Sequence, residues 1–290
     1  MAGVRKEVVA RGLAAPEGPL LLPDGHIAFV EQMRGRVSVF DGSKVEKISD
    51  APGSPNAVTL GSDGFLYVAQ NGGVVGAWRS NPRATPGIQR IHMDGKVEYV
   101  ATEIGGFATK APNDLLFGPD RRLYFTDPAE GYDPVGRVET GRLFALGGNK
   151  SEMLLDVGHS YPNGLAFMTD GRLVWVETYE RDVCVLEDGR RRLLCRLPEN
   201  HLPDGLDVAM DGRMFITTVT SRGITVVSPE GKIVDFIEFD SEALPTNCCF
   251  EGSILWVTDF TDGWADKQTT GRLWRVETDA VGKPQQPGRI

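Results

Sequence analysis

The chain repeats one pattern of polar and apolar positions six times. Each copy opens with a polar residue in a Pro- or Gly-containing setting and continues as a short apolar run. It then turns and resumes as a run of β-branched and aromatic residues; Pro162–Phe167 followed by Asp170–Val176 is the clearest copy. Two such runs separated by a tight turn predict a pair of antiparallel strands.

The spacing of the copies is typical of a repeat protein. Their polar positions are 39, 57, 50, 41 and 43 residues apart, and in the first five copies the turn residue Asp follows seven positions later. A repeat of about 40–50 residues built from short strands is typical of a β-propeller. The six polar positions are Glu17, Asn56, Asn113, Asn163, Asp204 and Asn247.

Each copy continues with a third alternating segment, and five of the six continue with a fourth. Period-two alternation with polar turns predicts four antiparallel strands per blade. The third segments are Gly35–Phe40, Ile88–Met93, Gly141–Leu146, Asp182–Leu186, Gly223–Val227 and Gly271–Val276. The fourth segments are Val45–Ile48, Val97–Val100, Met153–Asp156, Arg192–Cys195 and Ile233–Phe236.

The last copy lacks its fourth strand, whereas Lys6–Arg11 precedes the first copy with no blade of its own. We expect this N-terminal segment to supply the missing outer strand, because that closes the ring and removes an exposed sheet edge. The sequence therefore predicts an all-β protein, a six-bladed β-propeller with an N-terminal strand closing the last blade. Residues 1–290 are expected to form this one domain.

Composition and charge narrow the classes of function. The chain has 290 residues, 41% of them hydrophobic, and a formal net charge of −9, which disfavours binding to nucleic acid. The basic run Arg190–Arg192 is interpreted as a solvated hairpin end. No window approaches the roughly 18 apolar residues of a membrane span, and the first residues lack the apolar core of a secretory signal. The four cysteines show no metal-type spacing, so free thiols and a cytoplasmic location are expected.

Three long connections follow the second strands of their blades, at Gln70–Gly87, Pro128–Thr140 and Phe260–Thr270. Long loops in a compact fold often carry function. They and a neighbouring turn offer candidates for a pocket rim, although aromatic residues are more often packing residues. These candidates are Trp78, Arg79, Tyr132, Tyr179, Phe260 and Trp264.

The six polar positions open the innermost strands, so we expect them to converge at one mouth of the axial channel. Two carboxylates and four carboxamides offer only oxygen ligands, which suit a hard divalent cation such as Ca²⁺, Mg²⁺ or Mn²⁺. The four histidines show no zinc-type spacing. The alternative is that these residues satisfy turn amides, and Asn56 and Asn247 are the members that this alternative fits best.

Five motifs together resemble the family of gluconolactonases, regucalcin (senescence marker protein) and luciferin-regenerating enzymes, over nearly the whole chain. They are Pro16–Pro19, Pro112–Asp114, Tyr124–Pro128, Pro162–Phe167 and Pro203–Asp207. The resemblance implies one divalent metal ion held by Glu17, Asn163 and Asp204. It also implies that Asn113 is a further ligand or substrate contact and that the activity is lactone hydrolysis, in the setting of carbohydrate metabolism.

A mechanism follows as a hypothesis. The metal, with Ca²⁺ expected first and Mg²⁺, Mn²⁺, Zn²⁺ or Fe²⁺ as alternatives, would polarise the lactone carbonyl. Asp204 would take the proton of the attacking water. Asp127 opens a long loop and is a further candidate for substrate contact, the alternative being a turn residue.

The chain departs from the family at one position. Members similar to regucalcin carry an arginine two residues before the Asn113 position, whereas this chain has Ala111 beside Lys110. The expected substrate is a sugar-type or related small lactone, and this departure argues against a polyhydroxylated glucono-type lactone. Lys110 and Tyr132 are candidate substrate contacts. The alternatives are another metal-dependent hydrolysis, such as ester or phosphotriester cleavage, and a non-catalytic binding propeller. The sequence identifies neither the lactone nor the oligomeric state.

Overall fold

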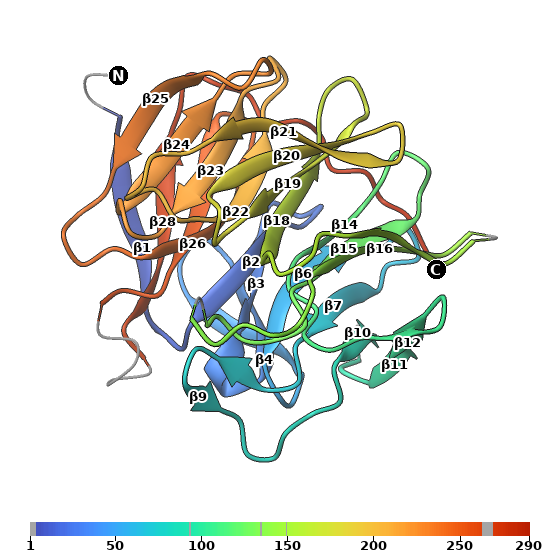
Figure 1. Ribbon diagram of the computed structural model, residues 1–290. Coiled ribbons are helices and arrows are strands. Elements are labelled where there is room, and N and C mark those ends of the chain that lie inside the picture. Colours follow the sequence, from blue (N-terminus) through green and yellow to red (C-terminus); the bar gives the residue numbers. More distant parts are fainter. Residues whose placement is uncertain (1–3, 93, 134, 149, 263–268) are drawn as a thin grey trace.

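Six four-stranded antiparallel sheets surround a common axis in the computed structural model, which describes residues 4–92, 94–133, 135–148, 150–262 and 269–290 (Figure 1). The described residues contain no α-helix, only the 3₁₀ turn η1 (Gln32–Arg34). This all-β, six-bladed propeller is the predicted fold.

Each of the first three blades is a meander of four strands. Blade 1 consists of β2 (Pro16–Leu21), β3 (Ile27–Glu31), β4 (Arg36–Phe40) and β5 (Val45–Asp50). Blade 2 consists of β6 (Pro55–Leu60), β7 (Leu66–Gln70), β10 (Gly87–Ile91) and β11 (Val97–Ala101). Blade 3 consists of β14 (Leu115–Phe117), β15 (Leu123–Asp127), β16 (Arg142–Leu146) and β17 (Glu152–Asp156).

The other three blades repeat this plan, and two short hairpins extend from blade 2. Blade 4 consists of β18 (Pro162–Phe167), β19 (Leu173–Glu177), β20 (Asp182–Glu187) and β21 (Arg190–Arg196). Blade 5 consists of β22 (Pro203–Val208), β23 (Met214–Thr218), β24 (Gly223–Val227) and β25 (Ile233–Glu238). Blade 6 consists of β26 (Pro245–Glu251), β27 (Ile254–Asp259), β28 (Gly271–Glu277) and β1 (Lys6–Leu13). The hairpins are β8–β9 (Val74–Val75, Trp78–Arg79) and β12–β13 (Glu103–Ile104, Phe107–Ala108).

The ring is closed by the N-terminal strand, as predicted. β1 pairs antiparallel with β28, and Lys6 lies opposite Val276 while Val8 lies opposite Trp274. In Figure 1 the blue N-terminal strand accordingly lies beside the orange and red strands of blade 6. Val8 also packs against the core between blades 5 and 6. The last sheet is therefore completed by a segment more than 250 residues away in sequence.

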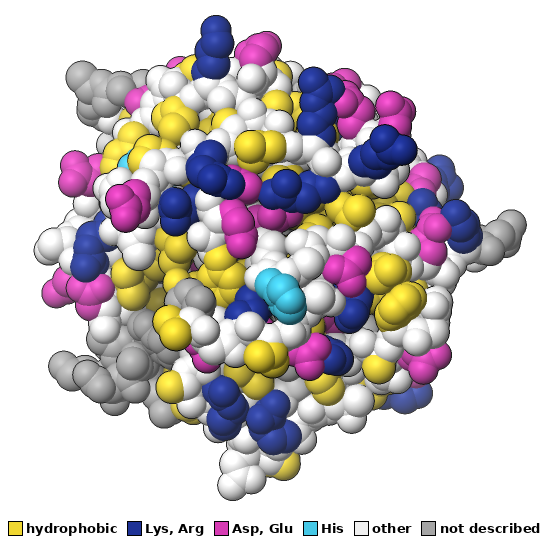
Figure 2. Space-filling model, in the orientation of Figure 1, with side chains coloured by type: hydrophobic (Ala, Val, Ile, Leu, Met, Phe, Trp, Pro, Cys, Tyr) yellow, Lys and Arg dark blue, Asp and Glu magenta, His cyan; other side chains and the backbone are white. Residues whose placement is uncertain are grey.

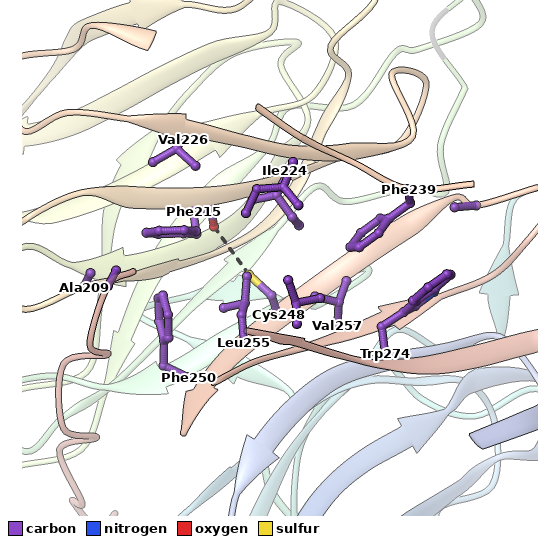
Figure 3. Close-up of a cluster of buried hydrophobic side chains, with 14 residues drawn as sticks. Ala209, Phe215, Ile224, Val226, Phe239, Cys248, Phe250, Leu255, Val257 and Trp274 are labelled. Atoms are coloured by element: carbon purple, nitrogen blue, oxygen red, sulfur yellow. Dashed lines mark hydrogen bonds between the residues drawn. The ribbon is translucent and has the colours of Figure 1, made fainter. Parts of the chain in front are cut away.

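Hydrophobic side chains fill the spaces between neighbouring blades. Figure 3 shows the cluster between blades 5 and 6, where the rings of Phe215 and Phe250 meet edge to face at 5.0 Å. The rings of Phe239 and Trp274 stack at the same distance. The Cys248 thiol lies within this cluster, 3.4 Å from the Phe215 carbonyl oxygen. Close packing of this kind makes the blades a rigid frame for the residues on the axis.

The surface carries both signs of charge. Acidic and basic side chains are interspersed over the face seen in Figure 2, with apolar side chains between them. Among the described residues, no helix has the length and apolar character needed to cross a membrane. The four cysteines are free thiols, as expected.

The C-terminal segment crosses one end of the ring. Gly282 forms a β-bridge with Ala209 of blade 5, and the Lys283 ammonium donates to the Phe167 carbonyl of blade 4 at 3.0 Å. Further along, the N–H of Ser62 in blade 2 donates to the Gly288 carbonyl at 2.6 Å. These contacts lie at or next to the turns between first and second strands. The long connections lie at the opposite end of the ring, where the first strands begin.

Candidate active site

A cavity of about 380 Å³ lies on the axis at the end where the first strands begin. Every blade contributes twice to it, once from the start of its first strand and once from the connection between its second and third strands. The first strands contribute Glu17, Asn56, Asn113, Asn163, Asp204 and Thr246. The connections contribute Gln32, Asn71, Val74, Val75, Gly76, Glu130, Gly131, Tyr132, Thr178, Val219, Thr220 and Phe260. The cavity therefore exists only once all six blades are in place.

Five of the six predicted polar positions line this cavity, and the sixth is displaced by one residue. In blade 6 it is Thr246, directly after Pro245, that faces the cavity. Asn247 lines a second cavity instead, where its Nδ2 donates to Asp114 Oδ2 at 3.3 Å, and its side chain also hydrogen-bonds with Glu17. Asn247 therefore contacts a residue of the first cavity without lining it, because neighbouring residues of a strand point to different sides.

β-Bulges direct the polar side chains at the axis. The pairing of first and second strands shifts register between Glu17 and Leu20 in blade 1, and likewise after Pro162 in blade 4 and Pro203 in blade 5. A bulge leaves an extra residue unpaired and reorients its side chain. Asn163 and Asp204 lie within such bulges, whereas Glu17 is the last paired residue before the bulge of blade 1.

A glycine directly follows each of the three residues expected to hold the metal. A Cβ on Gly18, whose φ is +49°, would lie 2.5 Å from the Ala57 Cα of the next blade. A Cβ on Gly164 would lie 2.6 Å from the carbonyl oxygen of Asp204, and Gly205 is similarly crowded by blade 6. Only glycine permits such close approach of neighbouring first strands. The glycines of the Pro-Glu-Gly, Pro-Asn-Gly and Pro-Asp-Gly motifs thus allow neighbouring first strands to lie close together around the axis.

Three carboxylates line the cavity, and two of them, Glu17 and Asp204, have no cationic side chain beside them among the described lining residues. Burial raises the pKa of Glu17 well above its ordinary value, and the nearby Asp204 carboxylate raises it further. Burial also raises the pKa of Asp204 to about 8, with repulsion from Asp114 adding to this and a hydrogen bond from Asn163 opposing it. Among the described residues that line the cavity there is no lysine or arginine.

The donor groups of the cavity fit a divalent cation. Two close carboxylates without a cationic partner are costly to bury unless a cation joins them. Asn163 Nδ2 donates to Thr178 Oγ1 at 3.1 Å, which holds the carboxamide in place beside Asp204. Asn56 Oδ1 accepts from Asn71 Nδ2 at 3.3 Å, so Asn56 already has a partner within the protein. Oxygen donors of this kind suit Ca²⁺, Mg²⁺ or Mn²⁺.

A second cavity of about 540 Å³ lies on the axis at the other end, beneath residues 282–287. It holds two carboxylates, and burial raises the pKa of Asp114 and of Asp207 to about 6. Their oxygens serve the protein itself: Asp207 accepts the N–H groups of Val208 and Phe250 at 2.7 and 2.9 Å. Asp114 accepts the N–H group of the residue that follows it, as well as the Asn247 carboxamide. The smaller cavity is therefore the candidate site.

A third acidic group lies within blade 4, where ligand atoms of Glu177, Asp182 and Cys184 lie within 4.8 Å of one another. Both carboxylates are paired with guanidinium groups. Arg191 donates to both of them, at 2.8 and 2.9 Å, and Arg196 donates to Asp182 at 2.6 Å. Burial raises the pKa of the Cys184 thiol, which disfavours the thiolate that a metal would need. This group is an ion-pair network.

Two of the four predicted substrate contacts line the cavity, and two do not. Asn113 and Tyr132 line the cavity, and burial raises the pKa of Tyr132. Asp127 does not line it, because its carboxylate accepts the N–H groups of Lys110, Ala111 and Ala129 at 2.8 to 2.9 Å. The Lys110 ammonium pairs with Glu139 outside the cavity.

Only some of the residues predicted for the pocket rim lie at the cavity. Phe260 lines the cavity, and Tyr179 supports it from behind, with its ring centroid 5.3 Å from those of Tyr132 and Tyr161. Trp78 and Arg79 lie on the β8–β9 hairpin but do not line the cavity. Trp264 lies outside the described residues.

Four further residues of the cavity, none of them predicted as ligands or catalytic groups, stand directly before the motif prolines. Tyr161, Leu202 and Leu244 each precede such a proline and line the cavity, as Ala111 does. The Tyr161 hydroxyl hydrogen-bonds with Asn113, and burial raises its pKa. The signal was present, because a residue before proline is extended and repeats at the same place in each blade.

A comparison with known protein families identifies one family for this chain. Residues 15–261 match the family described as "SMP-30/Gluconolactonase/LRE-like region". A gluconolactonase of Zymomonas mobilis is 26% identical over 291 residues, which cover 87% of this chain and 78% of the relative. Two solved structures share the fold. They are a luciferin-regenerating enzyme (TM-score 0.80, 19% identity, 99% and 100% of the two chains covered) and a calcium-binding protein, regucalcin, from Agrobacterium tumefaciens (TM-score 0.79, 16% identity, 99% and 98% covered).

Proposed function

The chain belongs to the SMP-30/Gluconolactonase/LRE-like family, and on that premise we propose that it is a lactonase that depends on one divalent metal ion. The proposal depends on one observation above all. Glu17 and Asp204 share a buried cavity with the carboxamide of Asn163 and without a cationic side chain among its described lining residues. The relative from Zymomonas mobilis is named a gluconolactonase, and the regucalcin structure is described as calcium-binding.

Glu17, Asn163 and Asp204 are the residues that would hold the metal, with Asn113 as a further ligand or a contact to the substrate. Calcium is the first candidate because the donors are all oxygen and two of them are carboxylates. A divalent cation bound there would act as a Lewis acid on the lactone carbonyl and would favour the ionised form of both carboxylates.

Asp204 is the residue that we assign as general base. Its carboxylate would accept the proton of a water molecule whose oxygen attacks the lactone carbonyl carbon. The new C–O bond would form as the carbonyl π bond opens to a tetrahedral adduct. Collapse of the adduct would break the ring C–O bond, and the proton held by Asp204 would pass to the leaving oxygen to give the hydroxy acid. Asn113, hydrogen-bonded to the Tyr161 hydroxyl, would orient the lactone for this attack.

The experiment that tests the proposal is a pH-stat assay on a panel of lactones after removal of metal with chelator. We expect no turnover without metal and recovery when Ca²⁺, Mg²⁺, Mn²⁺, Zn²⁺ or Fe²⁺ is added back singly. Hydrolysis that persists in chelator would refute metal dependence. A panel of carboxylic and phosphotriester substrates, assayed in parallel, would identify a different hydrolysis by its preference.

A further inference from the structure

We call Glu17, Asn163 and Asp204 the metal-binding floor of the candidate active site. The cavity walls beyond this floor carry several apolar side chains. Five hydrophobic side chains, each only partly buried, stand around the cavity on separate connections and strand starts. They come from three of the six blades, so no single loop accounts for them. These residues are Val74, Leu202, Val219, Leu244 and Phe260.

Two polar side chains of the walls, Asn71 and Thr220, form their hydrogen bonds with the protein itself. Asn71 donates to Asn56 and to the Val74 carbonyl and accepts two backbone N–H groups. Thr220 Oγ1 accepts from the Leu202 N–H at 3.1 Å and donates to a backbone carbonyl at 2.8 Å. A ligand rich in hydroxyl groups would leave water here and find few free partners, which is unfavourable.

One polar wall group keeps a buried oxygen without a hydrogen bond. That oxygen is Glu130 Oε1, which lies 3.4 Å from Arg137 Nη1. The Arg137 side chain is only 4% exposed and lies behind the rings of Tyr161 and Tyr179, at 5.5 and 5.1 Å. The buried guanidinium of Arg137 therefore balances the charge of Glu130.

Two long connections meet over the cavity. A Cβ on Gly131 would lie 2.5 Å from Val74 Cγ1, so the connection after β15 touches the β8–β9 hairpin. Val74 and Val75 of this hairpin face the cavity. A substituent of the substrate that extends from the metal-binding floor would thus be enclosed by aliphatic and aromatic groups.

We infer that the lactone accepted here carries an apolar substituent, such as an alkyl chain, instead of the hydroxyl groups of a sugar lactone. The inference rests on the proposed lactonase activity and specifies its substrate class. Each methylene group transferred from water into such a wall contributes free energy, which corresponds to a rise in kcat/KM of about three- to fourfold per methylene. The rise ends when the chain outgrows the cavity.

The test compares two substrate series on the metal-loaded protein: γ-lactones with alkyl chains of increasing length, and D-gluconolactone with other sugar lactones. We expect kcat/KM to rise with chain length and to exceed the sugar lactones. A flat alkyl series with faster hydrolysis of sugar lactones would overturn the inference and leave the proposed function intact. If neither series is hydrolysed although calorimetry shows metal binding, the proposed function fails, and the inference fails with it.

A pair of variants assigns the effect to the wall. Val219→Thr replaces a methyl group with a hydroxyl at the cavity, and Val281→Thr makes the same change at an exposed side chain at the other end of the ring. We expect Val219→Thr to lower kcat/KM about three- to tenfold for the longest alkyl lactone and not for the shortest. Val281→Thr should change neither. Equal effects of Val219→Thr on both lactones would contradict the assignment.

Discussion

Replacing Asp204 by asparagine should stabilise the metal-free protein while it abolishes activity. Burial raises the pKa of Asp204 from 3.8 to about 8, so the folded state holds a proton there that the unfolded state releases. Metal-free wild-type protein therefore loses stability as the pH rises from about 4 to about 8. Asparagine does not titrate, so the variant escapes this loss.

The magnitude follows from the size of the shift. At pH 7.5 the full penalty would be about 5 kcal/mol at 1.36 kcal/mol per pKa unit. Asp204 remains partly open to the cavity and shares repulsion with Glu17, so we take about half, roughly 2–3 kcal/mol. For 290 residues, with an unfolding entropy of about 2.1 cal/mol/K per residue, this raises Tm by about 3–5 °C.

Thermal melts in chelator, followed by circular dichroism at pH 4.5 and 7.5, test this reasoning. The gain in Tm should appear at pH 7.5 and be nearly absent at pH 4.5. Metal at about 100 Kd should add about 2.7 kcal/mol to the free energy of unfolding of the wild type and less to that of the variant. The difference in Tm between the variant and the wild type should therefore shrink or change sign. kcat should fall by about 10²–10⁴.

A matched control lies in the same blade. The pKa of Asp211 is lowered from its ordinary value by hydrogen bonds from Arg213, which outweigh the opposing effect of burial. Asp211→Asn should therefore leave stability unchanged or reduce it. A Tm of Asp204→Asn in chelator no higher than that of wild type would refute the electrostatic description of the cavity, and substantial residual kcat would refute the role as base.

Three further predictions concern the frame of the site. Gly164→Ala places a Cβ 2.6 Å from the Asp204 carbonyl oxygen and should weaken metal binding at least about tenfold by calorimetry; unchanged affinity would contradict the role of close strand approach. Deletion of residues 1–12 removes most of β1 and should lower Tm by about 10 °C or more; an unchanged melt would mean that the ring does not need this strand. Asp127→Asn should lower stability by about 1–3 kcal/mol in denaturant titrations with KM unchanged, whereas a raised KM at unchanged stability would show substrate contact.

Local patterns were sufficient to predict much of the architecture. Period-two alternation and the constant distance from polar residue to turn indicated the blades, and the unpaired segment Lys6–Arg11 indicated the closure with β28. In blade 6 the residue that lines the cavity is Thr246, one position before Asn247, and the prediction differed because the copy was aligned on an asparagine instead of on Pro245. A polar residue looks equally suitable at either position, but only one of them lies on the cavity side of the strand.

The role of Asp127 shows where a pattern stops being informative. A carboxylate at the start of a long loop resembles a substrate contact, but its oxygens are taken by three backbone N–H groups of the same blade. One of these N–H groups, that of Ala129, is two residues later and is a local turn contact. The other two, from Lys110 and Ala111, lie 16 to 17 residues earlier in the chain, and no local rule specifies them.

The sequence by itself determined the number of blades, the strand that closes the ring, and the Pro-x-Gly motifs of Glu17, Asn163 and Asp204, because strand periodicity and turn chemistry are properties of neighbouring residues. Only the tertiary structure decided that these three side chains share one buried cavity and that its walls are apolar. Convergence depends on the closure of the whole ring. Each blade adds two short segments to the cavity, and their common surroundings arise only when all six blades are packed together.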